Sequence, residues 1–479
     1  MNVGFGTSGL RGPAQSLLEG AASDYTAAFC RHLIDGAIVK PGDEVFVGED
    51  LRDSSPAIRL ACERAISAND LRPVICGAVP TPALAHFAMA RNAAAIMVTG
   101  SHIPADRNGL KFYLPHGEIT KRDEEAISAR LKPHAPPGDA SPAPDDRRDL
   151  RDIRARVMAN WFERYRGIVP SDCLAGLRIG IDEHSSVAAT SLGEILANYG
   201  ASIVPFGRLD HFEPLDTEAI DPERLNGYAR VLLRDNLFAI ATTDPDGDRP
   251  LLVDETGTPL RGDLLGWITA RWLDADAIAV PVNANSAIAS NGRIDVTRTR
   301  IGSPYVLEAM GETTRVGAHV SVGFEPNGGF MLGSAITLGA AQLLPLPTRD
   351  SVLPILGVLE EAASGKLKLS ELGKQAGFKP AASGRLKDFP VALARRLLDR
   401  MARDKNFASD FAAPVGDILA TDWTDGIRMS LSNGSILHLR PSGNAPEMRC
   451  YVEAETDSAA SILLSWGLER IGEMAGKSD

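Results

Sequence analysis

Cysteine is scarce in this sequence: its five residues are widely scattered and include no CxxC pair. Such spacing argues against both a disulfide framework and a cysteine zinc site, so a reducing, cytoplasmic location is expected. Long apolar runs are also missing, since none approaches the ~18 residues that span a bilayer. The opening segment, MNVGFGTSGLRG, lacks the apolar stretch of a secretory signal. We therefore expect no membrane partner.

Positive charge is in deficit, with 50 Lys and Arg residues against 62 Asp and Glu and a formal net charge of −12. This balance argues against nucleic acid or an anionic membrane surface as a partner. A small anionic ligand is compatible with it if arginines gather locally. The length of 479 residues, with 44% apolar and 23% charged content, is typical of a multidomain globular protein, either a monomer or a small homo-oligomer.

A pattern repeats over roughly the first three quarters of the chain. An apolar strand, a helical stretch, a second strand, another helical stretch and a third strand lead into a loop rich in Gly, Asp or Pro. The expected strands, three to a unit, are EVFVGED, RPVICGAV and AAAIMV; LRIGID, ASIVPFG and LFAIATT; AIAVPVN, RIDVTRT and AHVSVGF. The pattern predicts three doubly wound α/β units of mostly parallel strands, with ligands bound beyond the carboxyl ends of the strands.

Two other stretches indicate how the remaining chain is organised. Residues 134–149, HAPPGDASPAPDDRRD, have the composition of an exposed linker between the first and second units. Near the C-terminus, IRMSLS and SILHLR flank Asn433-Gly434, a strong hairpin signal. A further strand, MRCYVEA, and an amphipathic helix, SAASILLSWGLERI, complete a predicted smaller, antiparallel α+β domain.

The segment DPDGDRP follows the third expected strand of the second unit. Its carboxylates, Asp244, Asp246 and Asp248, can turn to one side of an extended loop, where they would repel one another without a cation. An EF-hand is rejected because Arg249 stands where that loop needs glycine and because the flanks are strand-like. Oxygen ligands near a phosphate favour Mg²⁺, whereas an acidic exposed turn is the alternative interpretation.

The segment RPSGNAPEMR has the composition of a phosphate cradle. Its two guanidinium groups, from Arg440 and Arg449, are charge-assisted donors. Between them, Ser442, Gly443 and Asn444 offer a hydroxyl, an unobstructed backbone amide and a side-chain amide. A surface turn containing Pro and Gly is an equally good interpretation of this segment alone.

Two glycine-containing loops give weaker signals. GFEPNGGF carries Glu325 and Asn327, whose polar groups can bind vicinal hydroxyls, although a simple loop explains it as well. GFGTSGLRG formally matches GxGxxG, but no strand precedes it and no βαβ unit surrounds it, which argues against a dinucleotide site. What remains there is a flexible turn that presents Arg11 to an anion.

The loop TGSHIPADRNGLKFY, residues 99–113, presents Ser101 directly after an apolar strand. The sequence lacks a GxSxG elbow, and adjacent residues at a strand end point opposite ways, so His102 is a poor base for Ser101. A serine can instead carry a phosphoryl group when a metal and cations such as Arg11 and Lys111 stabilise the transfer. Beside the other loops, that role is the preferred interpretation.

Together these segments resemble the α-D-phosphohexomutases, the family of phosphomannomutases and phosphoglucomutases. FGTSGLRG, TGSHIPADRNGLKFY, DPDGDRP, GFEPNGG and RPSGNAPEMRCYVEA occur in that family's order and approximate spacing, and the resemblance covers almost the entire chain. It implies four domains around a central cleft. Their expected ranges are 1–148 with the phosphoserine loop, 149–250 with the metal loop, 251–365 with the sugar loop and 366–479 with the phosphate loop.

The resemblance also implies a role for each loop. Ser101 would carry the phosphate and, with Asp244, Asp246 and Asp248, bind one Mg²⁺ ion per chain. Arg11 and Lys111 would assist proton transfer. The remaining implied contacts are His102 near the reacting oxygens; Arg249 facing the transferring group; Glu325 and Asn327 at the sugar hydroxyls; and Arg440, Ser442, Gly443, Asn444 and Arg449 at the non-reacting phosphate.

Three departures from the family's usual motifs bear on these roles. The serine loop usually has TASHNP, but Gly100 and Ile103 carry no chemistry, so little changes. Asn444-Ala445 stands where Thr-Glu is usual, and Asn444 can still donate to phosphate. The sugar loop usually has Glu-x-Ser-Gly, whereas Asn327 replaces the serine here. Selectivity among hydroxyls is therefore the least transferable inference.

The implied reaction is a two-step phosphoryl relay between hexose 6-phosphate and hexose 1-phosphate. Phospho-Ser101 would donate to the sugar, giving a bound hexose 1,6-bisphosphate that turns end for end and returns its other phosphate. The motifs are most similar to those of bacterial phosphomannomutases, so mannose is the expected sugar. Alternatives are a phosphoglucomutase or dual-specificity mutase, a metal-dependent sugar phosphatase and an inactive sugar-phosphate binder.

Overall fold

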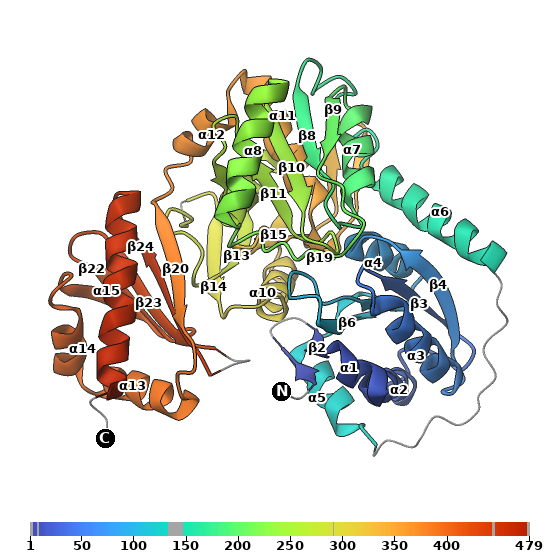
Figure 1. Ribbon diagram of the computed structural model, residues 1–479, viewed down its shortest axis with the longest axis horizontal. Coiled ribbons are helices and arrows are strands. Elements are labelled where there is room, and N and C mark those ends of the chain that lie inside the picture. The colour runs from blue at the N-terminus through green and yellow to red at the C-terminus, as the bar shows by residue number, and fades with distance from the viewer. Residues whose placement is uncertain (1–2, 7–8, 133–146, 291, 443–445, 477–479) are drawn as a thin grey trace.

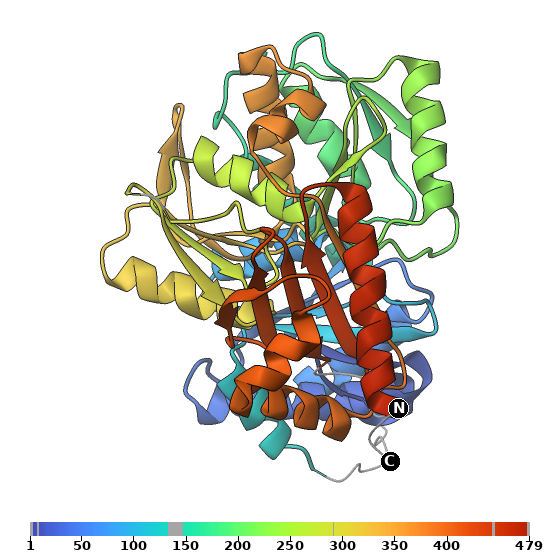
Figure 2. The same cartoon turned by 90° about the vertical axis from the view of Figure 1, so that its left-hand side faces the viewer.

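The computed structural model describes residues 3–6, 9–132, 147–290, 292–442 and 446–476. The chain forms four sheet-containing units, coloured blue to red in chain order, and the fourth lies to one side of the other three (Figure 1). A quarter turn brings the fourth unit to the front, with its long C-terminal helix facing the viewer (Figure 2). The expected α/β class is confirmed. Among the residues described, no helix is both long and apolar enough to cross a membrane.

The first unit begins with a short β-hairpin that precedes its doubly wound part. Its strands are β1 (Gly4–Phe5), β2 (Leu10–Pro13), β3 (Glu44–Glu49), β4 (Arg72–Ala78), β5 (Ala94–Val98), β6 (Arg107–Leu114) and β7 (Gly117–Glu118). Its helices are α1 (Ala14–Ser16), the π-helical η1 (Leu17–Ala21), α2 (Ala22–Asp35), α3 (Ser55–Ser67), α4 (Thr81–Met89) and α5 (Lys121–Ala129).

The second and third units follow the same plan. The second contains α6 (Arg147–Arg164), β8 (Arg178–Asp182), α7 (Ala189–Asn198), β9 (Ser202–Phe206), α8 (Pro222–Asp235), β10 (Ala239–Thr243), β11 (Pro250–Val253) and β12 (Pro259–Leu260). The third contains α9 (Gly262–Trp272), β13 (Ala277–Pro281), β14 (Asp295–Thr299), α10 (Ser303–Arg315), β15 (Ser321–Phe324), β16 (Phe330–Leu332), β17 (Ile336–Leu338), β18 (Ala341–Leu343), β19 (Leu346–Asp350) and α11 (Val352–Gly365).

Sheet topology confirms the predicted repeat. In each unit the first strand pairs in parallel with both the second and the third strand. A fourth strand then pairs antiparallel with the third. The resulting orders are β4-β3-β5-β6, β9-β8-β10-β11 and β14-β13-β15-β16. β5, β10 and β13 are buried along their whole length, as expected for parallel strands covered on both faces.

The fourth unit is the predicted antiparallel α+β domain. It contains β20 (Ala381–Leu386), α13 (Val391–Arg403), α14 (Lys405–Ala412), β21 (Ile418–Asp422), β22 (Ile427–Leu431), β23 (Ile436–Pro441), β24 (Met448–Glu453) and α15 (Asp457–Gly476). The preceding helix α12 (Leu369–Gln375) packs through Leu369 and Leu372 into the core of the first three units. The strand order of the fourth unit is β20-β24-β23-β22-β21. Asn433-Gly434 joins β22 to β23, and Gly434 has a φ of 79°, so the hairpin prediction is confirmed.

The hydrophobic cores divide the molecule differently from the sheets. One core contains Phe46, Ile181 and Phe324, so the first three units pack through continuous apolar contacts. The fourth unit has a core of its own, which includes Phe411 and Leu437. A unit with a separate core can move relative to its neighbours at lower cost than one that shares a core.

The expected domain ranges remain a proposal, and two of the boundaries fall within elements. The boundary after residue 148 lies inside α6, and the boundary after residue 250 lies inside β11. Because β12 pairs with β11, sheet pairing favours a division after Leu260. Residues 134–146 of the expected linker lie outside the described residues, and residues 147–149 begin α6.

Candidate active site

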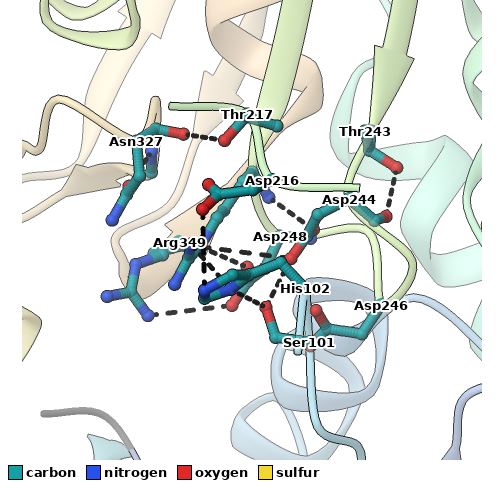
Figure 3. A network of polar contacts seen from close by, with 12 residues as sticks. Ser101, His102, Asp216, Thr217, Thr243, Asp244, Asp246, Asp248, Asn327 and Arg349 are labelled. Atoms are coloured by element: carbon teal, nitrogen blue, oxygen red, sulfur yellow. Dashed lines mark hydrogen bonds and ion pairs between the residues drawn. The ribbon is translucent and has the colours of Figure 1, made fainter. Parts of the chain in front are cut away.

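Three loops from three different units meet at one place (Figure 3). The serine loop joins β5 to β6, the metal loop joins β10 to β11, and the sugar loop joins β15 to β16. Each therefore begins at the carboxyl end of the third strand of its unit. The repeated topology places these ends alike in each unit, as expected for ligand sites in open α/β sheets.

Ser101 lies where the three loops meet and is 1% exposed. Its Oγ donates a hydrogen bond of 2.5 Å to Oδ2 of Asp244, which is 143 positions away in the sequence. The Ser101 backbone adopts a φ of 56°, and its N–H donates to Oγ1 of Thr99 over 2.8 Å. A non-glycine residue in this left-handed region is held there by its surroundings, a strain common at active sites.

The carboxylates of Asp244, Asp246 and Asp248 are buried and offer ligand atoms within 4.8 Å of one another. Lys111, on β6, donates from Nζ to Oδ2 of Asp246 and of Asp248, each over 2.5 Å. Thr81 Oγ1 donates to the same Asp246 oxygen over 2.6 Å. The Oδ1 atoms of Asp246 and Asp248 are buried without a hydrogen-bond partner in the described part of the chain. This donor set, with two unsatisfied oxygens, fits a metal ion.

Crowding shifts the pKa values of these carboxyl groups. Burial, followed by repulsion from Asp246 and Asp248, raises the pKa of Asp244 well above its usual value. Burial is the largest influence on Asp246 and acts in the same direction, but the charge of Lys111 and hydrogen bonds with Asp244, Lys111 and Thr81 together lower the Asp246 pKa. Burial opposes the charged form of Lys111, yet the aspartates raise its pKa. Lys111 is the cation closest to the carboxylates, and Arg249 and Arg349 lie 3.8 to 4.0 Å from Asp244 or Asp248.

His102 faces the serine hydroxyl, contrary to the expectation for a residue at a strand end. Its Nδ1 lies 3.5 Å from Ser101 Oγ and 3.0 Å from Nη1 of Arg249, and its Nε2 lies 3.9 Å from Asp216. Alternation fails here because the positive φ of Ser101 takes the backbone out of the extended conformation. Burial and the neighbouring arginines, Arg249 first and then Arg11, lower the pKa of His102, so its imidazole is neutral at pH 7.

Arginines converge on the same place. Burial, and then the charges of Arg249 and Arg349, lower the pKa of Arg11 to about 10. Arg249 is buried, and its Nε lies 4.0 Å from Asp244 and 3.9 Å from Asp248. Mutually repelling cations beside a buried hydroxyl form a strong attractor for a multiply charged anion.

Arg349, which the sequence motifs did not single out, links the sugar and metal loops. It lies near the end of β19, is 2% exposed, and donates from Nε to Oε2 of Glu325 over 2.7 Å. Its Nη2 lies 2.6 Å from the same oxygen and its Nη1 lies 3.8 Å from Asp248. The available signal was the charged pair Arg349-Asp350 at the end of a short, otherwise uncharged strand.

Asn327 is held by its own turn and by the second unit. Its Oδ1 accepts from the backbone N–H of Gly329 over 2.9 Å, and its backbone carbonyl accepts from Thr217 Oγ1 over 2.7 Å. Thr217 belongs to the loop between β9 and α8, which the motif analysis also missed (Figure 3). The amide oxygen of Asn327 therefore already has a hydrogen-bond partner within its own loop.

The fourth unit brings two of the predicted arginines together. Arg440 on β23 and Arg449 on β24 are directly opposed Cα partners, so their side chains share one face of the sheet. Like charges in that position repel, which favours an anion between them. Arg440 Nε lies 2.8 Å from Asp425, and Arg449 Nη2 lies 3.7 Å from Glu447.

The rest of the predicted phosphate loop is less completely placed. Ser442 is 6% exposed, and its N–H donates to the carbonyl of Glu447 over 2.8 Å. Gly443 and Asn444 lie outside the described residues. Within the described chain, no direct polar contact joins Arg440 or Arg449 to the serine, metal or sugar loops. A cavity of about 370 Å³, lined by Pro326 and His438 among others, separates the sugar loop from the sheet of the fourth unit.

Comparison with known proteins matches this architecture. Residues 2–135 match a family model described as phosphoglucomutase/phosphomannomutase, alpha/beta/alpha domain I, and residues 261–376 match domain III of the same family. The chain is 46% identical to a phosphomannomutase of Sinorhizobium fredii over 98% of both proteins. It is 39% identical to a phosphomannomutase of Salmonella muenchen, covering 99% of this chain and 97% of that protein.

The fold is similar to that of a solved phosphoglucomutase/phosphomannomutase family protein from Burkholderia thailandensis. The TM-score is 0.73 at 20% identity, covering 99% of this chain and 97% of the other. The repeated fold and the full-length matches define the class as the α-D-phosphohexomutases, which are isomerases. Within that class, the chain belongs to the phosphoglucomutase/phosphomannomutase family. The roles of individual residues stay predictions.

Proposed function

We propose that this protein interconverts hexose 6-phosphate and hexose 1-phosphate, with mannose as the sugar, through a phosphorylated Ser101 and a hexose 1,6-bisphosphate. The observation that carries the proposal is the buried Ser101 hydroxyl, 2.5 Å from Asp244 within a cluster of three aspartates and Lys111. A hydroxyl buried beside carboxylates and cations is suited to hold a phosphoryl group and not to bind water. The choice of mannose follows the two phosphomannomutase relatives.

The metal we assign to the aspartates is Mg²⁺. All the donors are oxygens, and the unsatisfied Oδ1 atoms of Asp246 and Asp248 provide ligands that the protein leaves unused. A phosphate on Ser101 would add a further oxygen to Asp244, Asp246 and Asp248. When bound, Mg²⁺ neutralises charge on the transferring phosphoryl group.

In the first step, the bond between Ser101 Oγ and phosphorus breaks as a sugar hydroxyl oxygen bonds to the phosphorus. Ser101 Oγ takes a proton as it leaves the phosphorus, and the sugar hydroxyl gives up one proton as its oxygen bonds to the phosphorus, so a group that gives the first proton and regains the second keeps the count balanced. Arg11, with its pKa lowered to about 10, is the better placed of the two proposed helpers to exchange these protons. Lys111, whose pKa is raised, stays charged and stabilises the phosphoryl oxygens together with Arg249.

The sugar is held at its other end by the fourth unit. Arg440 and Arg449, opposed across β23 and β24, supply the forks for the non-reacting phosphate, with Ser442, Gly443 and Asn444 completing the cradle. Glu325 and Asn327 bind the sugar hydroxyls between the two phosphates. After the bisphosphate turns end for end, the second phosphate returns to Ser101 by the reverse of the first step.

We further propose that the enzyme works in the cytoplasm on small hexose phosphates and has no nucleic acid or membrane partner. All five cysteines are free thiols, which suits a reducing compartment. The net charge of −12 is unsuited to polyanionic partners.

The test is intact-mass spectrometry combined with coupled assays on mannose 1-phosphate and glucose 1-phosphate, primed with a trace of the bisphosphate. We expect the wild-type protein to carry one added phosphate, which Ser101→Ala abolishes together with mutase activity. Faster turnover of the mannose substrate supports the sugar assignment, and equal rates indicate dual specificity. Free phosphate released without the isomer would show a phosphatase instead.

A further inference from the structure

Arg52 contacts the serine loop from a direction that no sequence motif indicated. It lies between β3 and α3 in the first unit and is 2% exposed. Its Nη2 donates to the backbone carbonyls of Ser101, over 2.8 Å, and of Ile103, over 2.6 Å. One guanidinium therefore fixes the main chain at Ser101 and again two residues later.

Arg52 is itself fixed by a buried acid. Asp50, which is 2% exposed, forms an ion pair with Nη1 of Arg52 and accepts its backbone N–H over 3.1 Å. The same carboxylate accepts from Ser55 Oγ over 2.6 Å and from Thr99 Oγ1 over 2.7 Å. These bonds satisfy the acid almost completely, so its charge is stably buried.

The network reaches Ser101 from both sides. Thr99 Oγ1, which donates to Asp50, accepts the N–H of Ser101, while Arg52 binds the carbonyl of Ser101. Opposed bonds on the two peptide groups of one residue restrain its φ and ψ together. This explains why Ser101 holds a φ of 56° without being a glycine.

The second unit closes over this network. Phe212, in the loop between β9 and α8, lies with its ring centroid 4.0 Å from Cζ of Arg52, a cation–π contact. The same unit carries the metal loop. Arg52 therefore ties the position of the serine loop to the unit that supplies Asp244, and the contact excludes water from the guanidinium.

We propose that Arg52 is a positioning residue for phosphoryl transfer: it holds Ser101 in the strained conformation that aims the hydroxyl at the carboxylate cluster. It contacts neither substrate nor metal and acts through the main chain of the serine loop. The inference rests on the proposed function, because it assigns Ser101 as the phosphate carrier. Lysine is a poor replacement for arginine here, since one ammonium nitrogen on a shorter reach cannot take the places of both Nη1, which binds Asp50, and Nη2, which binds the two carbonyls.

The test is Arg52→Lys, assayed for steady-state kinetics and for the rate at which Ser101 gains phosphate from hexose 1,6-bisphosphate. We expect kcat and the phosphorylation rate to fall about 10- to 100-fold, as misplacement of a reacting group by about 1 Å does. KM for the hexose phosphate should stay within about twofold, because Arg52 does not touch the substrate. Arg59→Lys is the matched control, since Arg59 on α3 pairs with Glu49 and Glu63 and lies outside the network.

A folded Arg52→Lys protein with wild-type kcat, or one in which only KM changes, overturns the proposal. If Arg52→Lys does not fold, Phe212→Leu tests the proposal, because it removes the aromatic ring over Arg52 and leaves the Arg52–Asp50 ion pair in place. We expect a smaller fall in kcat from Phe212→Leu, again at constant KM, and an unchanged kcat overturns the proposal. A wild-type protein that forms no isomer and gains no phosphate would instead sink the proposed function, and this inference with it.

Discussion

Arg349 joins two loops that come from different units of the fold. Its guanidinium lies against Glu325 of the sugar loop and near Asp248 of the metal loop, and all three side chains are buried. A planar fork suits this place because it meets two carboxylates in two directions. The residue therefore matters for the shape of the site even though it stands in none of the recognised motifs.

Arg349→Met is expected to lower the free energy of unfolding by about 3 to 5 kcal/mol, because it leaves buried carboxylates without their partner. Activity should fall as well, since Glu325 loses its anchor. Urea unfolding followed by tryptophan fluorescence measures the first effect. As a control, Arg72→Met breaks an ion pair with Glu44 in which Arg72 is 66% exposed, and should cost about 0 to 1 kcal/mol. Equal losses in the two variants would contradict the assignment of Arg349 as a buried anchor.

At the scale of elements, the turn between β10 and β11 is closed by two backbone hydrogen bonds. Asp244 N–H donates to the carbonyl of Arg249 over 3.0 Å, and Gly247 N–H donates to the carbonyl of Asp244 over 3.0 Å. Gly247 has a φ of 76°, and a Cβ there would lie 2.7 Å from Cβ of Ala188. The turn thus needs glycine both for its backbone conformation and for space.

Gly247→Ala should raise the Mg²⁺ concentration needed for half-maximal activity and destabilise the fold by about 1 to 3 kcal/mol. Titration of activity with Mg²⁺ checks the first effect, and thermal unfolding checks the second. Gly257→Ala is the matched control because Gly257 has a φ of 88°, in the turn between β11 and β12, with its nearest contact at 3.4 Å. It should lose stability without changing the Mg²⁺ dependence. A Gly247→Ala enzyme with an unchanged dependence would argue against a metal in this turn.

At the scale of the whole molecule, the fourth unit is attached through few polar contacts. Asn285 Nδ2 donates to the carbonyl of Lys379 over 2.9 Å, Ser286 N–H donates to Glu453 over 3.0 Å, and Ile301 N–H donates to Asp425 over 3.0 Å. With a separate core and a cavity beside it, this unit can close on a ligand.

Closure predicts that hexose 1,6-bisphosphate with Mg²⁺ reduces the radius of gyration measured by small-angle scattering. In the proposed function, a phosphate of this ligand would neutralise the opposed Arg440 and Arg449, and the sheet could then approach the sugar loop. Arg449→Ala should abolish most of the compaction. An unchanged radius of gyration at saturating bisphosphate would show that the fourth unit does not move.

The sequence predicted the fold closely because the signals were local. Apolar runs of strand length, spaced by helical stretches, gave nine strands that all appear in the first three units, and Asn433-Gly434 gave the hairpin of the fourth. Domain boundaries follow less directly from local signals. A boundary depends on which elements pack together, and α6 packs on α4 and β4 of the preceding unit although the sequence before it suggests a linker.

The motifs also indicated most of the chemical groups that meet in the structure. Ser101, Lys111 and the three aspartates could be named because serine, lysine and carboxylates carry recognisable chemistry in loops at strand ends. Arg349, Arg52 and Thr217 could not, because each acts through a partner far away in the sequence. The orientation of His102 was missed since a positive φ at Ser101 is set by contacts with Thr99 and Arg52.

The amino-acid sequence by itself determined the repeated α/β units, the antiparallel final unit and the identity of the loops that carry charge. These follow from the periodicity of apolar residues and from turn residues, which act over a few positions. Only the tertiary structure decided that the Ser101 hydroxyl meets Asp244 and that Arg349 spans two loops. The Ser101–Asp244 and Arg349–Asp248 contacts join residues more than a hundred positions apart, so they exist only where the packing of separate units creates them.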